Sequence, residues 1–115
     1  MRVCTTVAAA ALAAGLGTPA HAQDPNYARS LAATCMTCHG TDGHSVGGIP
    51  PSLAGHDKSY LVQQLKEFKA GKRPATIMHQ HAQGYTDEQL ESIATYFSGV
   101  KAGPGAAAPA ARGAY

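Results

Sequence analysis

The sequence predicts a small all-α domain with three main helices. Three stretches, within residues 25–38, 58–70 and 86–99, place apolar residues at the three- and four-residue spacing of an amphipathic helix. Segments rich in glycine and proline separate these stretches. No stretch alternates apolar and polar residues as a half-buried strand does, and no segment repeats another. These observations favour a helical fold without a sheet.

Capping residues and apolar spacing define the first two helices. Asp24 is placed to cap the first helix, and Pro25 suits its first turn. The predicted apolar face of this helix comprises Ala28, Leu31, Ala32 and Cys35. Asp57 is a good N-cap for the second helix, and Gly71 is expected to end that helix at Ala70. The apolar positions of the second helix are Leu61, Leu65 and Phe68.

The third helix has the clearest signal. Thr86 and Gln89 match a capping box at its start, and Gly99 is expected to stop it. Its apolar stripe comprises Leu90, Ile93, Ala94 and Phe97. The segments between the helices, Gly40–Gly55 and Lys72–Tyr85, are predicted to be loops because glycine and proline interrupt both.

The first 22 residues have the features of a secretory signal peptide. Arg2 supplies a positive charge, and an alanine-rich apolar run follows. The sequence Ala20-His21-Ala22 matches the small-x-small pattern that a signal peptidase cuts. We therefore expect residues 1–22 to be cleaved and the protein to be exported to the periplasm. The apolar run is too short to span a bilayer, so no transmembrane anchor is expected after cleavage.

The rest of the chain divides into a folded domain and a tail. Residues 23–101 contain every predicted helix and are expected to form one domain, whereas residues 102–115 read as a flexible tail rich in Ala, Gly and Pro. The formal net charge of +2 indicates no basic footprint for nucleic acid. The basic residues between Lys66 and Arg73 are one candidate surface for docking to a redox partner.

One short motif predicts the chemistry of the chain. The sequence Cys35-Met36-Thr37-Cys38-His39 matches the C-x-x-C-H pattern that attaches a c-type haem. Two cysteines on one side of a helical turn suit the two vinyl groups on one edge of a porphyrin, and the adjacent histidine can reach the iron. A thioredoxin-like pair requires a βαβ context, and a zinc site requires four ligands. We predict one covalent haem c, with thioether bonds to Cys35 and Cys38 and with His39 as an axial ligand.

Met78 is the predicted sixth ligand of the haem iron. Of the methionines beyond the signal peptide, Met36 lies inside the attachment turn, on the same side as His39. Met78 lies in the loop before the last helix, where a distal ligand is expected. Ligation by histidine and methionine raises the reduction potential and leaves no open position for a substrate, which favours electron transfer. The alternative sixth ligands are His79 and His81.

Further residues have smaller predicted roles. The ring N–H of His39 needs an acceptor, and the backbone carbonyl of Pro51 is placed to serve. Tyr85 is expected to pack in the haem pocket, and the other aromatic residues, Tyr60, Tyr96 and Phe97, in the pocket or the core. His44 and His56 are expected on surface loops. A second transition-metal site that combines them with the histidines near Met78 is left open.

These features together resemble class I cytochromes c. The resemblance rests on a leading helix, the C-x-x-C-H motif, the Pro51-Ser52-Leu53 loop, the distal Met78 and a closing amphipathic helix. In that family the first and last helices cross, and the haem edge stays partly exposed. The resemblance implies a domain whose three main helices wrap around one covalently bound haem.

Two segments are also similar to the haem subunit of flavocytochrome c sulfide dehydrogenases. They lie between Cys38 and Gly48 and between Thr76 and Tyr85. The resemblance implies an FAD-containing partner subunit that oxidises sulfide, and a downstream acceptor such as a cytochrome, an oxidase or a reaction centre. Some members have two haem domains, whereas this chain has one C-x-x-C-H motif, which implies a single-haem form.

From these patterns we expect an electron-transfer protein that is no enzyme on its own but a subunit of such a dehydrogenase. The alternative is a free, diffusible cytochrome c that shuttles electrons between periplasmic complexes. A haem enzyme or a gas sensor would require a labile sixth ligand, and a structural metal-binding module would lack covalent haem. No nucleophile–base pair, carboxylate dyad or phosphate-binding loop is apparent in the sequence.

Overall fold

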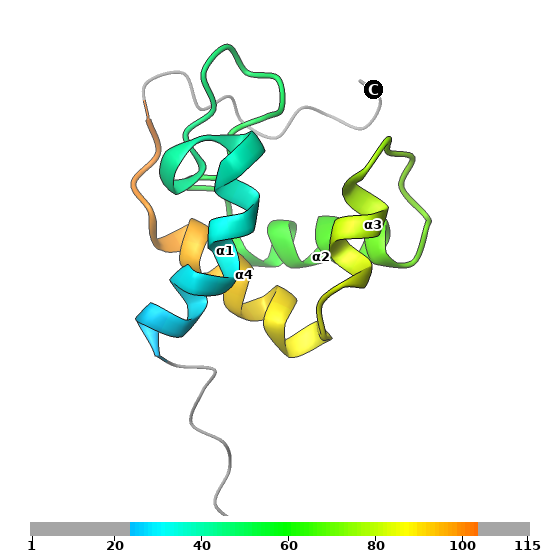
Figure 1. Cartoon of the computed structure of the whole chain (residues 1–115). Helices are drawn as coiled ribbons and strands as arrows, with labels where there is room; N and C mark the ends of the chain where they lie inside the picture. Colours follow the sequence, from blue (N-terminus) through cyan, green and yellow to red (C-terminus); the bar gives the residue numbers. More distant parts are fainter. Residues whose placement is uncertain (1–23, 104–115) are drawn as a thin grey trace, which may run out of the picture.

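The computed structural model describes residues 24–103, and over this range the chain is all-α (Figure 1). Four α-helices and one short 3₁₀ helix occur within these residues, and no strand does. In chain order they are α1 (Pro25–His39), η2 (Thr41–Gly43), α2 (Lys58–Lys69), α3 (Met78–Gln83) and α4 (Asp87–Gly99). The predicted all-α class is therefore confirmed. The predicted signal peptide and residues 104–115 of the predicted tail lie outside the described residues.

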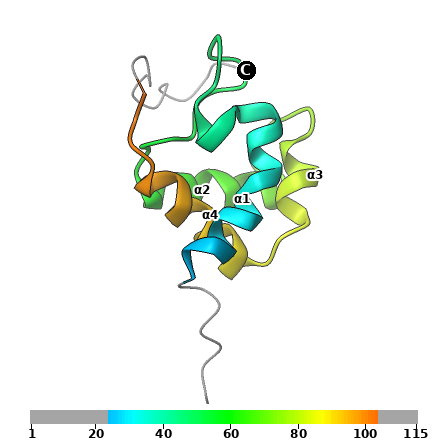
Figure 2. The ribbon, with the colours of Figure 1, turned by 60° about the vertical axis from the view of Figure 1, so that its left-hand side comes forward.

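Helix α4 is the central element of the packing. It contacts both α1 and α2, and α2 in turn contacts α3. Helices α1 and α3 therefore lie at opposite ends of this series (Figure 1). The loop between η2 and α2 extends beyond the helices, as the second view of the ribbon also shows (Figure 2). Within the described range, no helix has both the length and the apolar character needed to cross a membrane.

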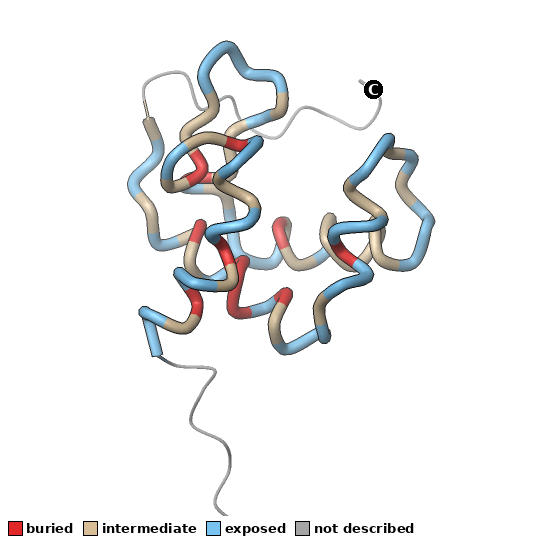
Figure 3. The backbone as a smooth tube through the Cα atoms, in the orientation of Figure 1, coloured by how far each residue is buried: buried red, intermediate tan, exposed pale blue. Residues whose placement is uncertain are grey.

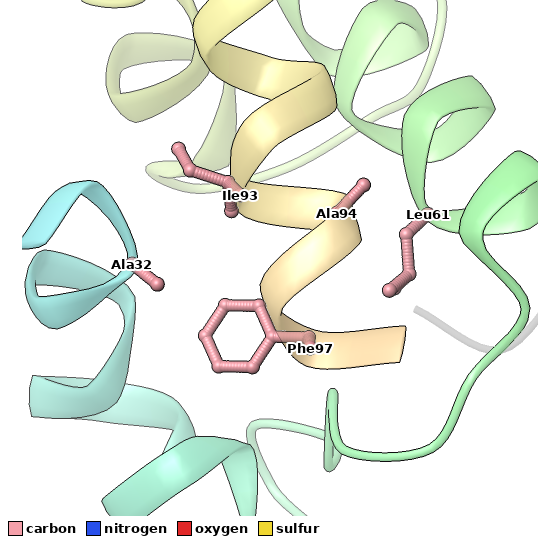
Figure 4. Packing of buried hydrophobic residues seen from close by; sticks show 5 residues of the cluster. All are labelled: Ala32, Leu61, Ile93, Ala94 and Phe97. Atoms are coloured by element: carbon pink, nitrogen blue, oxygen red, sulfur yellow. The ribbon is translucent and has the colours of Figure 1, made fainter. Parts of the chain in front are cut away.

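A small apolar core forms where α1, α2 and α4 meet. Its buried members are Ala32 of α1, Leu61 of α2, and Ile93, Ala94 and Phe97 of α4 (Figure 4). Ile93 and Phe97 point toward the α1 side, and Ala94 points toward α2. The buried positions of α1 and α4 accordingly lie side by side (Figure 3). The predicted apolar stripe of the last helix is confirmed, because its four members are all buried.

Polar side chains cap the three long helices as predicted. Asp24 accepts a hydrogen bond from a backbone N–H in the first turn of α1 at 2.8 Å. Asp57 accepts two such bonds at the start of α2, at 2.8 and 3.1 Å. Thr86 and Gln89 exchange both bonds of the capping box, at 3.2 and 2.9 Å. These bonds satisfy N–H groups that have no partner inside the helix.

The helix ends differ slightly from the predicted ones. Helix α1 continues through His39, and α2 ends at Lys69, one residue earlier than expected. Gly71 adopts a left-handed conformation just beyond α2, which favours glycine after a helix. Helix α4 ends at Gly99 as predicted, and the chain becomes extended at Val100 (φ −77°, ψ 133°).

The loop prediction for residues 72–85 is wrong in part, because this segment contains α3. The helix begins without a capping side chain, since Ile77 at its N-cap makes no side-chain hydrogen bond. Its six residues are too few to display a helical period in the sequence. A helix this short is unstable alone, and it forms here because it packs on α2, with Ala82 buried.

Gly43 allows the loop after α1 to lie directly against α4. Its φ is +80°, and a Cβ atom at this position would lie 2.7 Å from Cδ1 of Phe97. The Gly43 carbonyl accepts hydrogen bonds from the N–H groups of Leu53 at 2.8 Å and Ala54 at 3.2 Å. The N–H of Gly55 donates to the Phe97 carbonyl at 2.9 Å. Both ends of the predicted 40–55 loop are thus attached to α4, and only its middle extends into solvent.

Gly43→Ala tests this close approach, and Gly48→Ala is the matched control. Gly48 has nearly the same φ, +78°, but no atom lies within 4 Å of the position that a Cβ would occupy there. We expect Gly48→Ala to lower the free energy of unfolding by about 1 kcal/mol through backbone strain alone. Gly43→Ala adds overpacking against the Phe97 ring and should cost about 2 to 4 kcal/mol. Denaturant unfolding measures both values, and equal losses would contradict the steric explanation.

Candidate haem-binding site

His39 is the last residue of α1 and is buried, with 7% of its surface exposed. Its Nδ1 lies 2.6 Å from the carbonyl oxygen of Pro51. Because a carbonyl oxygen can only accept, Nδ1 carries the proton and donates this hydrogen bond. The lone pair is then on Nε2, which has no hydrogen-bond partner among the described residues. A held imidazole in this tautomer is suited to bind a metal through Nε2.

The two cysteines of the motif precede His39 in the last turns of α1, and both are free thiols. Cys35 is half-buried and packs against the core, whereas Cys38 is exposed. Burial raises the pKa of the Cys35 thiol, a backbone hydrogen bond opposes this rise, and the nearby Cys38 adds to it. The Cys35 thiol is therefore protonated at neutral pH. Residues three apart lie on one helix face, so both sulfur atoms are available together.

The chain turns sharply after His39, and an acidic residue holds the turn. Asp42 has a positive φ of 51°, and its Oδ1 accepts a hydrogen bond from the Tyr96 hydroxyl at 2.5 Å. Arg29 of α1 lies 3.7 Å from the same oxygen. Burial, followed by the bond to Asp42, raises the pKa of Tyr96. Sequence reasoning missed this anchor, although aspartate next to glycine is typical of a tight turn.

Met78 and the two nearby histidines all lie on α3. Met78 is its first residue and, like His79, is partly buried, whereas His81 is exposed. Met78 is absent from the core cluster, so it does not serve as core filling among the described residues. Met36, in contrast, packs against that cluster from α1. The structure thus leaves the Met78 thioether available while Met36 is used in packing.

A second metal site does not form in the part of the chain that the structure describes. No three His, Cys, Asp or Glu side chains gather there in a way that could hold a metal ion. The site left open for His44, His56, His79 and His81 is therefore absent from residues 24–103. His44 and His56 are partly buried rather than exposed, and the His56 ring lies 5.6 Å from that of Tyr60.

The surroundings of the motif fit a large apolar cofactor. Five residues form the buried core, and nine more pack against it while remaining partly exposed. Those nine are Leu31, Cys35, Met36, Leu53, Tyr60, Val62, Leu65, Tyr85 and Tyr96. Most members of this apolar cluster are therefore only partly covered, as expected where a haem supplies further contacts. Two free thiols, a held imidazole and this apolar margin together fit haem c.

The structure changes the interpretation of the predicted basic docking surface. Lys66 lies 3.3 Å from Glu91 and 3.8 Å from Asp87, and Lys69 lies 2.7 Å from Asp87. The Lys69 hydrogen bond is the main reason why the pKa of Asp87 is lowered. These two lysines join α2 to α4 within the molecule. Their charges are largely balanced by α4, so they are poor candidates for attracting a partner.

The chain is similar in sequence to known c-type cytochromes. Residues 27–101 match the family model for cytochrome c. The cytochrome subunit of sulfide dehydrogenase from Chlorobaculum tepidum is 45% identical over 67 residues, which are 58% of this chain and 60% of that protein. Cytochrome c-554(548) from Halomonas halodenitrificans is 41% identical over 68 residues, which are 56% of this chain and 82% of that protein.

A solved structure supports the same fold. The cytochrome c4 of Acidithiobacillus ferrooxidans superposes with a TM-score of 0.57 and 36% sequence identity. The match covers 64% of this chain and 49% of the cytochrome c4 chain. The chain thus spans about half the length of that protein, and three fifths of the Chlorobaculum subunit.

Tyr96→Phe tests the anchor of the turn after His39, with Tyr60→Phe as the matched control. The Tyr96 hydroxyl donates to Asp42, whereas the Tyr60 hydroxyl makes no hydrogen bond within residues 24–103. Because a hydrogen bond to a charged, partly exposed acceptor is lost, we expect Tyr96→Phe to lower the free energy of unfolding by about 1 kcal/mol. Tyr60→Phe should change it by less than about 0.5 kcal/mol. Thermal unfolding followed by circular dichroism checks both, and equal effects would refute the anchoring role.

Proposed function

Since this chain belongs to the cytochrome c family, we propose that it is a periplasmic haem c subunit that receives electrons from a sulfide-oxidising flavoprotein. Cytochromes c carry electrons and do not catalyse a reaction by themselves. The observation that carries the proposal is the end of α1, where the held imidazole of His39 follows two free thiols. The flavoprotein partner is supported by similarity alone, and the geometry supports the electron-carrying role.

In this proposal each residue of the motif has a distinct task. Cys35 and Cys38 anchor the cofactor through thioether bonds, and His39 presents Nε2 to the iron. The Pro51 carbonyl keeps the His39 ring from rotating and fixes its tautomer. When bound, the haem supplies reversible one-electron chemistry at its iron. A ligand held this firmly requires little rearrangement between the two oxidation states, which suits a carrier.

Met78 completes the proposed ligand set, and its position supports this role. It lies on α3, at the opposite end of the helix series from α1, and is not used in the core. A thioether ligand raises the reduction potential, and it closes the sixth position against oxygen or substrate. A haem enzyme or gas sensor would need that position open. Tyr85, which packs at the edge of the core, is proposed to line the pocket.

The proposed partner is the FAD-containing subunit of a sulfide dehydrogenase. The relative from Chlorobaculum tepidum carries the name of such a cytochrome subunit, at 45% identity. Electrons would then pass to a downstream cytochrome, oxidase or reaction centre. Residues 1–22 are proposed to act as the export signal, which would place both proteins in the periplasm.

A free shuttle cytochrome is the second candidate, and one observation favours it. The match to cytochrome c-554(548) covers 82% of that protein, so a chain of this size occurs in the family as a protein of its own. Copurification from native periplasm separates the two candidates. The subunit proposal requires a flavin-containing partner and haem reduction that depends on sulfide. A lone haem protein that sulfide reduces only slowly would leave the shuttle and would exclude the subunit.

Met78→Ala tests the proposed sixth ligand, with His79→Ala and His81→Ala as controls on the same helix. We expect Met78→Ala to abolish the weak red-end absorption band of sulfur ligation and to lower the reduction potential, since a thioether ligand favours the reduced iron. Both histidine variants should keep the band. Visible spectroscopy and redox titration of the purified holoprotein measure these properties. Survival of the band in Met78→Ala would exclude this residue as the ligand.

A further inference from the structure

Lys69 links the end of α2 to the segment that follows α3. Its Nζ donates hydrogen bonds to the carbonyl oxygen of Tyr85 at 2.8 Å and to Oδ1 of Asp87 at 2.7 Å. Its side chain is 31% exposed, whereas that of Lys66, one turn earlier, is 41% exposed. Bonds from an ammonium group to a carbonyl and a carboxylate are charge-assisted and stronger than neutral ones. The lysine is therefore a firm connection between two segments that are distant in sequence.

This connection holds the point at which the chain leaves α3. The helix ends at Gln83, two residues before Tyr85. Two backbone hydrogen bonds close this exit: the Gly84 N–H donates to the His81 carbonyl at 3.1 Å, and the Tyr85 N–H donates to the Ala82 carbonyl at 3.3 Å, which is just beyond the usual range. Within the described residues, Lys69 is the partner of the Tyr85 carbonyl. The exit of α3 thus depends on a side chain from α2 as well as on its own backbone.

The entry to α3 is held less directly. The Arg73 guanidinium lies 4.5 Å from the centre of the Phe68 ring and donates a hydrogen bond to the side chain of Gln64. Between Arg73 and α3, residues 74–76 make no hydrogen bond in the described part of the chain. The attachment nearest to Met78 on this side is therefore several residues away and separated from it by an unbonded stretch.

We infer that Lys69 is a positioning residue for Met78, a step that rests on the proposed ligation by Met78. Six helical residues span about 9 Å and move as one piece, so a fixed exit limits where the first residue can lie. A helix this short and uncapped needs outside contacts to stay in place. Holding the exit reduces the excursions of the thioether away from the iron. Loss of the lysine should make the sixth ligand easier to displace.

Lys69→Met tests this inference, and Lys66→Met is the matched control. Lys66 also bridges α2 and α4 through Asp87 and Glu91, but it makes no contact with the exit of α3. In the ferric holoprotein we expect Lys69→Met to bind added imidazole about tenfold more tightly than wild type. Imidazole must displace the Met78 thioether, and this displacement costs less free energy once the charged hydrogen bond that holds α3 is lost. Lys66→Met should bind imidazole as wild type does, and Lys69→Arg should restore most of the resistance. Imidazole titration followed in the visible spectrum gives these values.

A second measurement keeps the test decisive if Lys69→Met folds poorly. Asp87→Asn removes the charge partner of Lys69 but leaves the hydrogen bond to the Tyr85 carbonyl. On heating, the Asp87→Asn holoprotein should therefore keep the red-end absorption band of sulfur ligation to almost the same temperature as wild type. Lys69→Gln should lose that band at a temperature below the loss of helical circular dichroism. If imidazole affinity is unchanged in Lys69→Met and Lys69→Gln, or is raised equally in Lys66→Met, the positioning role of Lys69 is overturned while the proposed ligation by Met78 still stands. A band that survives Met78→Ala would instead overturn the proposed ligation, and this inference with it.

Discussion

The burial of Phe97 against the loop after α1 is the contact on which most of this small domain depends. The ring is 1% exposed and points toward α1, and Gly43 lies so close to it that a side chain there would clash. The Phe97 carbonyl also accepts the Gly55 N–H, so one residue of α4 holds both ends of the loop. Pro51 lies between those ends. The acceptor for the His39 ring is therefore placed by packing some distance from the ring itself.

The two sides of the proposed haem site are held in different ways. On the α1 side, a buried imidazole is fixed by a backbone carbonyl, and the turn that follows is fixed by Asp42 and Tyr96. On the α3 side, a short uncapped helix depends on α2 and on the ammonium group of Lys69. One proposed ligand is thus buried and hydrogen-bonded to the backbone, and the other lies on a helix that is attached at its exit by a surface lysine. This difference explains why the proposed ligand exchange would begin at α3.

The small size of the core implies that the cofactor also contributes to the stability of the fold. Nine hydrophobic residues are buried, five of them alanines, and the apolar side chains around the central cluster are left partly exposed. Small domains with limited cores commonly need a disulfide, a metal or a bound group for stability. The described cysteines are both free, so no disulfide fills that need. Covalent haem c would meet it, and folding of this chain is then expected to depend on attachment of the haem.

The sequence by itself determined the parts of this protein that local chemistry specifies. The caps at Asp24, Asp57 and Thr86, the apolar stripe of α4 and the attachment motif all lie within a few consecutive residues, so their spacing alone predicts them. The tertiary structure decided the rest. Helix α3 has no local signal and exists through its packing on α2. The Tyr96–Asp42 and Lys69–Tyr85 hydrogen bonds join residues 54 and 16 positions apart. Such partners come together only after the chain has folded, because no periodicity or cap records which distant group a polar side chain will meet.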